Sequence, residues 1–216
     1  MEHQMQSLAD QVFEVLERDI LNGSYSRGEA LTEARLCENL RVSRTPVREA
    51  VKRLEQEHLL EVTSKGMVVK GLSREDIADI YEIRYRLEGL SARRLAERAT
   101  PEDLEKMRET LDLQEFYTLR NDSESIKNMD SQFHRDIYLF CGSNALRYTL
   151  DGLIMRIVKY RKASVSHSGR APKSLEEHRA IYAAIAAHDG DTAERLMQAH
   201  VRAAYEALKK SGQDDS

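Results

Sequence analysis

Apolar positions in the first seventy residues recur at helical spacing and then change to the short runs typical of strands. Residues 7–21, 32–40 and 43–54 each place their aliphatic side chains on one helical face. Residues 59–63 and 67–70 are rich in aliphatic and β-branched residues and are separated by a Ser-Lys-Gly turn, which is typical of a hairpin. The pattern therefore predicts three helices followed by a small β-hairpin.

The remainder of the chain has helical apolar spacing throughout, from about residue 73 to about residue 210. The longest predicted loop covers residues 166–172. We expect a mainly α protein with two domains. Residues 1–71 are expected to form the helix-and-hairpin domain, and residues 72–216 an all-α antiparallel bundle of six or seven helices.

The third predicted helix has the composition of a helix that lies in a DNA major groove. Its polar positions near the start are Ser43, Arg44, Thr45 and Arg48. Ser43 can cap the helix, and arginine can donate two parallel hydrogen bonds to guanine. Lys52 and Arg53 lie further along, where phosphate contacts are expected. A solvated charged face is the alternative interpretation of such a cluster.

Composition limits how such a protein could bind DNA. The formal net charge is -4, so DNA affinity must come from local placement of cations and from doubling of sites in a dimer. The sequence has no apolar run near twenty residues and no signal-peptide pattern, which predicts a cytoplasmic protein with no membrane partner. Its two cysteines are expected to be reduced.

Three histidines and an aspartate stand beside or on apolar faces of the predicted C-terminal helices. Asp130 and His134 are one helical turn apart, and His178 and His200 lie on later helices. An ionisable group on an apolar face costs free energy unless it is paired or bound to a metal. Together the four suit zinc, nickel, manganese or iron with positions open to a ligand. For each histidine alone, a hydrogen-bonded core residue is the alternative.

The N-terminal motifs resemble the winged helix-turn-helix domain of GntR-type transcription regulators, because of Ile20–Gly23 and especially Val42–Ala50. The resemblance implies a hairpin wing and contacts with operator DNA. The residues implied are Arg35, Ser43, Arg44, Thr45, Arg48, Lys65 and Gly66. Arg41 and His58 depart from the family pattern, which usually has glycine at both positions, and Arg41 offers an additional phosphate contact.

The C-terminal motifs resemble the all-helical, FCD-type ligand-sensing domain of the FadR branch of the same family. The resemblance implies that an aspartate and three histidines hold one divalent ion per chain, with zinc the first choice and nickel, manganese or iron the alternatives. Those ligands would be Asp130, His134, His178 and His200. A small carboxylate effector then completes the coordination. Arg84 matches an arginine that pairs with the acid; its alternative is an intrahelical ion pair with Glu88. Further pocket candidates are Arg156, Tyr160 and Arg161.

These observations predict a homodimeric transcriptional regulator, a repressor by the commoner family arrangement, that binds a palindromic operator under control of the acid. It is not expected to be an enzyme. Three alternatives stay open at this point. They are a metal-dependent hydrolase or lyase that uses the Asp/His cluster, a regulator that senses the metal itself, and a regulator with a purely structural ion.

Overall fold

The structure is a computed structural model of the chain that describes residues 7–21, 23–64, 66–154 and 170–210. Lys65, Arg156, Tyr160 and Arg161 therefore lie outside the described residues. Close contacts divide the chain into two compact units, of which the first ends at Asp76 and the second begins at Ile77. Each unit is described separately below.

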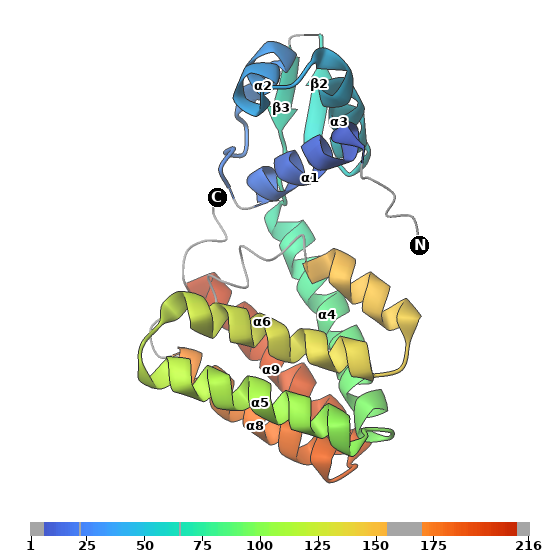
Figure 1. The fold of residues 1–216 in the computed structure, drawn as a ribbon, viewed down its shortest axis with the longest axis vertical. Helices are drawn as coiled ribbons and strands as arrows, with labels where there is room; N and C mark the ends of the chain where they lie inside the picture. Colours follow the sequence, from blue (N-terminus) through green and yellow to red (C-terminus); the bar gives the residue numbers. More distant parts are fainter. Residues whose placement is uncertain (1–6, 22, 65, 155–169, 211–216) are drawn as a thin grey trace. The chain divides into compact units, whose positions relative to one another are not determined.

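The first unit contains three helices and a three-stranded sheet (Figure 1). The helices are α1 (Leu8–Leu21), α2 (Glu33–Leu40) and α3 (Arg44–Gln56), and the strands are β1 (Ala30–Leu31), β2 (Leu60–Thr63) and β3 (Gly66–Val69). The sheet is antiparallel in the order β1-β3-β2. The predicted helices and hairpin are confirmed. The third strand, β1, was not predicted, because two residues are too few to show strand alternation.

The turns around α2 and α3 explain how the two helices meet. Thr32 caps α2, and its hydroxyl accepts from the amide of Arg35 at 3.2 Å. Arg41 and His58 have φ values of 55° and 58°, so both adopt the left-handed conformation that glycine would adopt more easily. Ser43 occupies the N-cap of α3, but its side chain makes no capping hydrogen bond with the described residues. The predicted Ser43 side-chain cap is therefore wrong.

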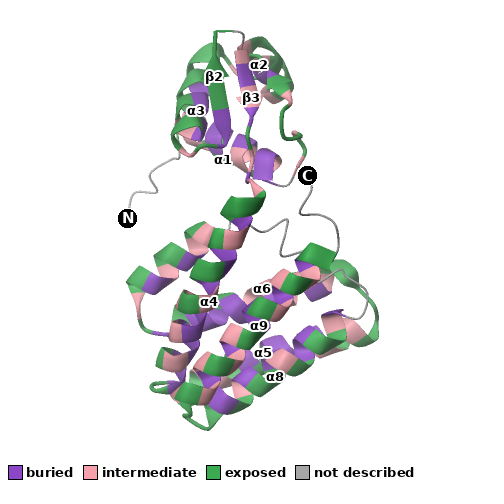
Figure 2. Ribbon diagram, turned by 180° about the vertical axis from the view of Figure 1, so that it is seen from behind, coloured by how far each residue is buried: buried purple, intermediate pink, exposed green. Residues whose placement is uncertain are grey.

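The core of the first unit forms where α3 packs on α1 and α2. The buried face of α3 comprises Pro46, Val47, Ala50, Val51 and Leu54. Leu16 of α1 and Leu36 of α2 are fully buried against this face. Because the apolar face of α3 is used inside its own unit, the opposite polar face is exposed (Figure 2).

The second unit is entirely helical among its described residues. Its helices are α4 (Arg74–Ala96), α5 (Pro101–Leu119), α6 (Ser123–Phe140), the helical residues 144–154, α8 (Arg170–Ala186) and α9 (Gly190–Lys210). Helix α5 packs on α6 and α8, and α8 packs on α9, as Figure 1 shows. The buried residues of these helices, purple in Figure 2, form the core of the unit. The predicted all-α domain is confirmed.

One predicted loop boundary in this unit is wrong. The loop was expected to run to residue 172, but α8 already begins at Arg170. Pro172 lies in the first turn of α8, where its missing N–H removes no helical hydrogen bond. Residues 166–169 of the predicted loop lie outside the described residues. Among the helices that the structure describes, none combines the length and the apolar composition needed to cross a bilayer.

Candidate nucleic-acid interface and metal centre

The polar side chains predicted to contact DNA lie together on the exposed face of α3 and at its start. Ser43, Arg44, Thr45 and Arg48 are all exposed. Packing of the opposite α3 face against α1 and α2 fixes the direction in which these side chains leave the helix. The arrangement suits a helix that enters a major groove with its N-terminal residues toward the bases.

Arg48 is held by a carboxylate of the neighbouring helix. Its Nε donates to both carboxylate oxygens of Glu33, at distances of 3.0 Å and 2.9 Å. The hydrogen bond that Arg48 donates to Glu33 is also the largest influence on the pKa of Arg48, which is raised. Arg35 is paired as well, since its Nη1 lies 2.9 Å from Oε1 of Glu29. Arg35 and Arg48 therefore each have an acidic partner within the same unit.

Arg53, which the sequence places further along the same helix, has partners within its own unit. Its Nη1 donates to Oδ1 of Asp10 at 2.5 Å, and its guanidinium carbon lies 3.9 Å from the ring centroid of Phe13. Both partners belong to α1, so Arg53 joins α3 to α1 inside the unit. A phosphate contact of Arg53 stays a prediction.

Gly66 belongs to the hairpin, although as the first residue of β3 and not as part of the turn. It pairs with Thr63 and has a φ value of 127°, which a side chain would strain. The hydroxyl of Thr63 donates to the carbonyl of Gly66 at 3.0 Å. These contacts close the hairpin next to Lys65.

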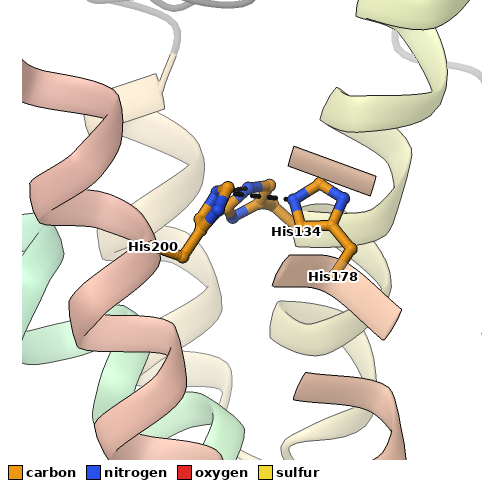
Figure 3. Close-up of side chains that lie close together, drawn as sticks. All are labelled: His134, His178 and His200. Atoms are coloured by element: carbon orange, nitrogen blue, oxygen red, sulfur yellow. Dashed lines mark hydrogen bonds between the residues drawn. The ribbon is translucent and has the colours of Figure 1, made fainter. Parts of the chain in front are cut away.

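Three histidines from three helices converge in the second unit (Figure 3). His134 lies on α6, His178 on α8 and His200 on α9, and all three are buried. Nε2 of His200 lies 3.2 Å from Nε2 of His134 and 3.3 Å from Nε2 of His178. One ring nitrogen from each histidine can be chosen so that all three lie within 4.8 Å of one another. Phe133 stacks on His178 with ring centroids 4.1 Å apart and restricts that ring.

The outer nitrogen of each histidine contacts a side-chain oxygen. The distances from Nδ1 are 2.7 Å to Glu88 for His134, 3.0 Å to Gln114 for His178, and 2.7 Å to Glu177 for His200. Carboxylate and amide oxygens accept, so each Nδ1 carries the hydrogen and donates it. In a neutral imidazole with this tautomer, Nε2 has no hydrogen and carries a lone pair that can accept a hydrogen bond or bind a metal. Three lone pairs that face one another repel unless a cation or protons lie between them.

The spacing of the three Nε2 atoms fits a metal ion. Zinc–nitrogen bonds of about 2.05 Å in a tetrahedron separate the nitrogens by about 3.3 Å. The distances from Nε2 of His200 to Nε2 of His134 and of His178, 3.2 Å and 3.3 Å, agree with this value. Outer-shell acceptors that orient ligating histidines are also typical of metal sites. The donor set and its geometry therefore fit a divalent ion.

Asp130, the fourth predicted ligand, lies next to the three histidines but does not belong to the group whose ligand atoms all lie within 4.8 Å of one another. It is buried, and its Oδ1 lies 3.7 Å from Nε2 of His178. The same Oδ1 accepts from the hydroxyl of Ser174 at 3.1 Å. The carboxylate is thus on the same side of His178 as the other two histidines, within reach of an ion bound there.

Arg84 is fully buried and lies one contact away from the histidines. Its Nε donates to Oε1 of Glu88 at 2.5 Å, while Oε2 of Glu88 accepts from His134. Burial by itself lowers the pKa of Arg84, but the charge of Glu88 outweighs it and the pKa is raised overall. The intrahelical pair with Glu88 is therefore present. Nη1 of Arg84 is nevertheless buried and has no hydrogen-bond partner among the described residues.

A second arginine supports the opposite side of the cluster. Nη1 of Arg170 lies 2.8 Å from Oε2 of Glu177, the same oxygen that accepts from His200. Burial tends to raise the pKa of Glu177, but His200 and Arg170 outweigh this effect and the pKa is lowered. Glu177 is therefore a carboxylate at neutral pH, which strengthens the hydrogen bond that orients His200.

Sequence reasoning did not assign the partners that orient the histidines. Glu177 could have been noticed in the sequence, because it directly precedes the predicted ligand His178. Glu88 could also have been noticed, as an acidic residue on a predicted apolar face. Gln114 could not, because a lone glutamine on a helix is not distinguishable from a surface residue without the fold.

These features define a class of protein: a winged helix-turn-helix unit joined to a helical unit that contains a buried cluster of three histidines. Residues 79–203 match the FCD domain family, and residues 8–69 match the family of bacterial regulatory proteins described as gntR. The chain belongs to the GntR family and carries an FCD domain. It is a transcriptional regulator, as the family and its relatives are, and not a hydrolase or lyase. GntR regulators bind operator DNA.

Full-length relatives agree with this assignment. The transcriptional repressor RspR of Escherichia coli is 26% identical over 98% of this chain and 93% of its own. The galactonate operon transcriptional repressor of Escherichia coli is 25% identical over 93% of this chain and 96% of its own. Among solved structures, Escherichia coli McbR/YncC matches with a TM-score of 0.74 and 25% identity, over 95% of this chain and 99% of that one.

Proposed function

We propose that this chain is a repressor whose affinity for a palindromic operator is controlled by a small carboxylate, bound at a divalent-metal site in the FCD domain. The convergence of three histidine Nε2 atoms, each on a ring whose Nδ1 lies within hydrogen-bond distance of a side-chain oxygen, is the observation that carries the proposal. Two relatives of this chain are repressors, and one of them controls a galactonate operon, which is named for a sugar acid.

The residues would divide the work in the following way. His134, His178 and His200 would hold the ion, zinc first, and Asp130 would be the fourth protein ligand. A bound divalent ion would supply open coordination positions for a carboxylate oxygen. The unpaired Nη1 of Arg84 would donate to the same carboxylate, because a buried donor without a partner is costly and a carboxylate is its best acceptor.

Helix α4 links the proposed effector site to the DNA-binding unit. Its first residues, Arg74–Asp76, group with the DNA-binding unit, whereas Arg84 and Glu88 lie in the second. About ten residues of continuous helix, or about 15 Å, separate Arg74 from Arg84. In this proposal, a displacement of Arg84 by the acid would pass along α4 toward the DNA-binding unit. Coupling of about 1–3 kcal/mol would change operator affinity about fivefold to a hundredfold.

A homodimer is part of the proposal, because a palindromic operator requires two recognition helices related by a two-fold axis. Leu113, Phe116 and Leu119 are exposed on α5, and Leu119 retains 79% of its accessible area. Apolar side chains clustered on a surface are a common sign of a protein interface. Light scattering during gel filtration measures the mass, and a monomer that binds a single half-site would contradict this part.

Metal content tests the site directly. Protein treated with a chelator and then incubated with zinc is passed through a desalting column, and bound metal is counted by mass spectrometry. We expect one ion per chain for the unaltered protein and a loss of stoichiometric metal for His178→Ala. His188→Asn is the matched control, because His188 lies in the same domain and donates to the carbonyl of Ala96 instead. Equal metal in His178→Ala and the unaltered chain would remove the assignment.

Operator binding tests the control. The operator is identified by sequencing genomic fragments that the protein retains at moderate salt, and binding to it is followed by fluorescence anisotropy with sugar acids and other small carboxylates. We expect an acid to change affinity only when metal is present. A change with metal alone would favour metal sensing, and a response to acid after chelation would place the effector elsewhere. For base reading, we expect Arg48→Ala to weaken operator binding more than binding to unrelated DNA.

A further inference from the structure

Arg48 is anchored at one end and open at the other. Its Nε donates to both oxygens of Glu33, and Nη1 and Nη2 have no hydrogen-bond partner among the described residues. We propose that Glu33 is a positioning residue for DNA recognition, which holds Arg48 so that it presents Nη1 and Nη2 end-on to a guanine. The proposal rests on the proposed role of Arg48 in reading bases.

Guanine has two acceptors in the major groove, O6 and N7, and an arginine can reach both at once. It can do so side-on with Nε and one Nη, or end-on with Nη1 and Nη2. In this structure Glu33 occupies Nε, so only the end-on pair is available. The carboxylate thereby selects one of the two geometries before DNA arrives.

The position of Glu33 is set by packing. It is the first residue of α2, directly after the capping residue Thr32, and its negative charge is favourable at that end of the helix. Leu36, one turn later, is fully buried and fixes the rotation of α2 against α3. The carboxylate oxygens are therefore carried by a well-anchored turn.

Stability alone does not explain the contact. The side chain of Arg48 is 63% exposed and that of Glu33 is 36% exposed. Ion pairs this accessible to water contribute little to folding. A carboxylate close to the DNA-facing surface also repels phosphates, which lowers affinity for every sequence. Since Glu33 adds little to stability and lowers general affinity for DNA, we expect its benefit to be in specificity, the ratio of operator to non-operator affinity.

The test compares Glu33→Ala and Glu33→Gln with the unaltered protein. Affinities for the operator and for a scrambled duplex are measured by anisotropy in the same salt. We expect Glu33→Ala to lower the ratio of the two affinities about fivefold, the lower end of discrimination by one bidentate pair. Glu33→Gln keeps an oxygen that can accept from Nε, so it should restore part of that loss.

A pure charge effect would act differently. It would change both affinities by the same factor and make the Ala and Gln variants equal, and either result overturns the proposal. Glu38→Ala is the matched control, because it removes an exposed carboxylate from the same helix. We expect it to leave the ratio unchanged, and equal loss of specificity in Glu38→Ala would also overturn the proposal. Melting curves establish that all variants are folded at the assay temperature.

A double variant separates this proposal from its premise. If Glu33 acts through Arg48, Glu33→Ala should have no further effect on the ratio in an Arg48→Ala background. A further loss there would overturn the positioning role while leaving the base-reading role of Arg48 intact. If Arg48→Ala alone leaves the ratio unchanged, the premise fails and the positioning role fails with it.

Discussion

Replacing Arg84 by methionine should destabilise the helical unit, because it leaves a buried carboxylate without its cation. The side chains of Arg84 and Glu88 are 1% and 0% exposed, and Nε lies 2.5 Å from Oε1. Removing one partner of a buried ion pair costs about 3–5 kcal/mol. Arg84 also carries an unpaired buried Nη1, and its removal returns about 1–3 kcal/mol. The net loss should be about 2 kcal/mol, a large part of a typical stability of about 5–15 kcal/mol.

The loss is measured by urea unfolding in the presence of a chelator, so that metal binding does not contribute. Near-ultraviolet tyrosine signals report on the helical unit, because eight of the nine tyrosines follow Asp76. Arg86→Met is the control: Arg86 pairs with Glu82 on the same helix, but its side chain is 70% exposed. An exposed pair should contribute less than about 1 kcal/mol.

A second substitution tests the reasoning. In Arg84→Met, adding Glu88→Gln removes the uncompensated charge, so the double variant should recover at least about 1 kcal/mol. The argument is refuted if Arg84→Met costs no more than Arg86→Met. It is refuted equally if the double variant is no more stable than Arg84→Met, because the unpaired Glu88 charge would then not be the cause.

Three further outcomes follow from the structure. Burial is the largest influence on the pKa of Asp136 and raises it above 3.8. The charged form of Asp136 therefore lowers the stability of the fold as the pH rises above that value. Asp136→Asn should raise the melting temperature at pH 7 and make the melting temperature less dependent on pH. Leu54→Ala, at a position with 0% exposure, should destabilise the DNA-binding unit by about 2–5 kcal/mol in thermal unfolding, and a smaller loss would mean that the cavity collapses. Arg44→Ala should weaken operator binding by about 1–3 kcal/mol in anisotropy, whereas Lys52→Ala should weaken all sequences alike; the reverse pattern would exchange their roles.

The helices were predictable because their apolar spacing repeats over several turns. The predictions that failed concern features that depend on a few individual contacts. Strand β1 has two residues and forms only by pairing with β3, which lies more than thirty residues later in the chain. Ser43 has the residue type of a cap, but a residue type does not fix a rotamer. The contacts of Arg53 with Asp10 and Phe13 of α1 were likewise not predicted, because they depend on how α1 packs against α3.

For the candidate metal centre, the sequence predicted the histidines but not the side chains that orient them. Histidines on apolar faces are visible in a sequence, because burying them without partners is costly. Their orienting partners come from distant helices: Glu88 is 46 residues from His134, and Gln114 is 64 residues from His178. Periodicity carries no information about such pairings, since any of several helix arrangements would bury the same faces.

Arg48 and Arg84 share one device in two different environments. In each, a carboxylate accepts from Nε and leaves the other end of a planar guanidinium for a planar acceptor, guanine for Arg48 and a carboxylate for Arg84 in the roles proposed above. Arg48 is exposed, so water satisfies its Nη atoms until DNA arrives and little energy is stored. Arg84 is buried, and its Nη1 has no partner among the described residues, which costs free energy that an acid would remove in the role proposed above. The same geometry therefore favours specificity on the surface and affinity in the interior.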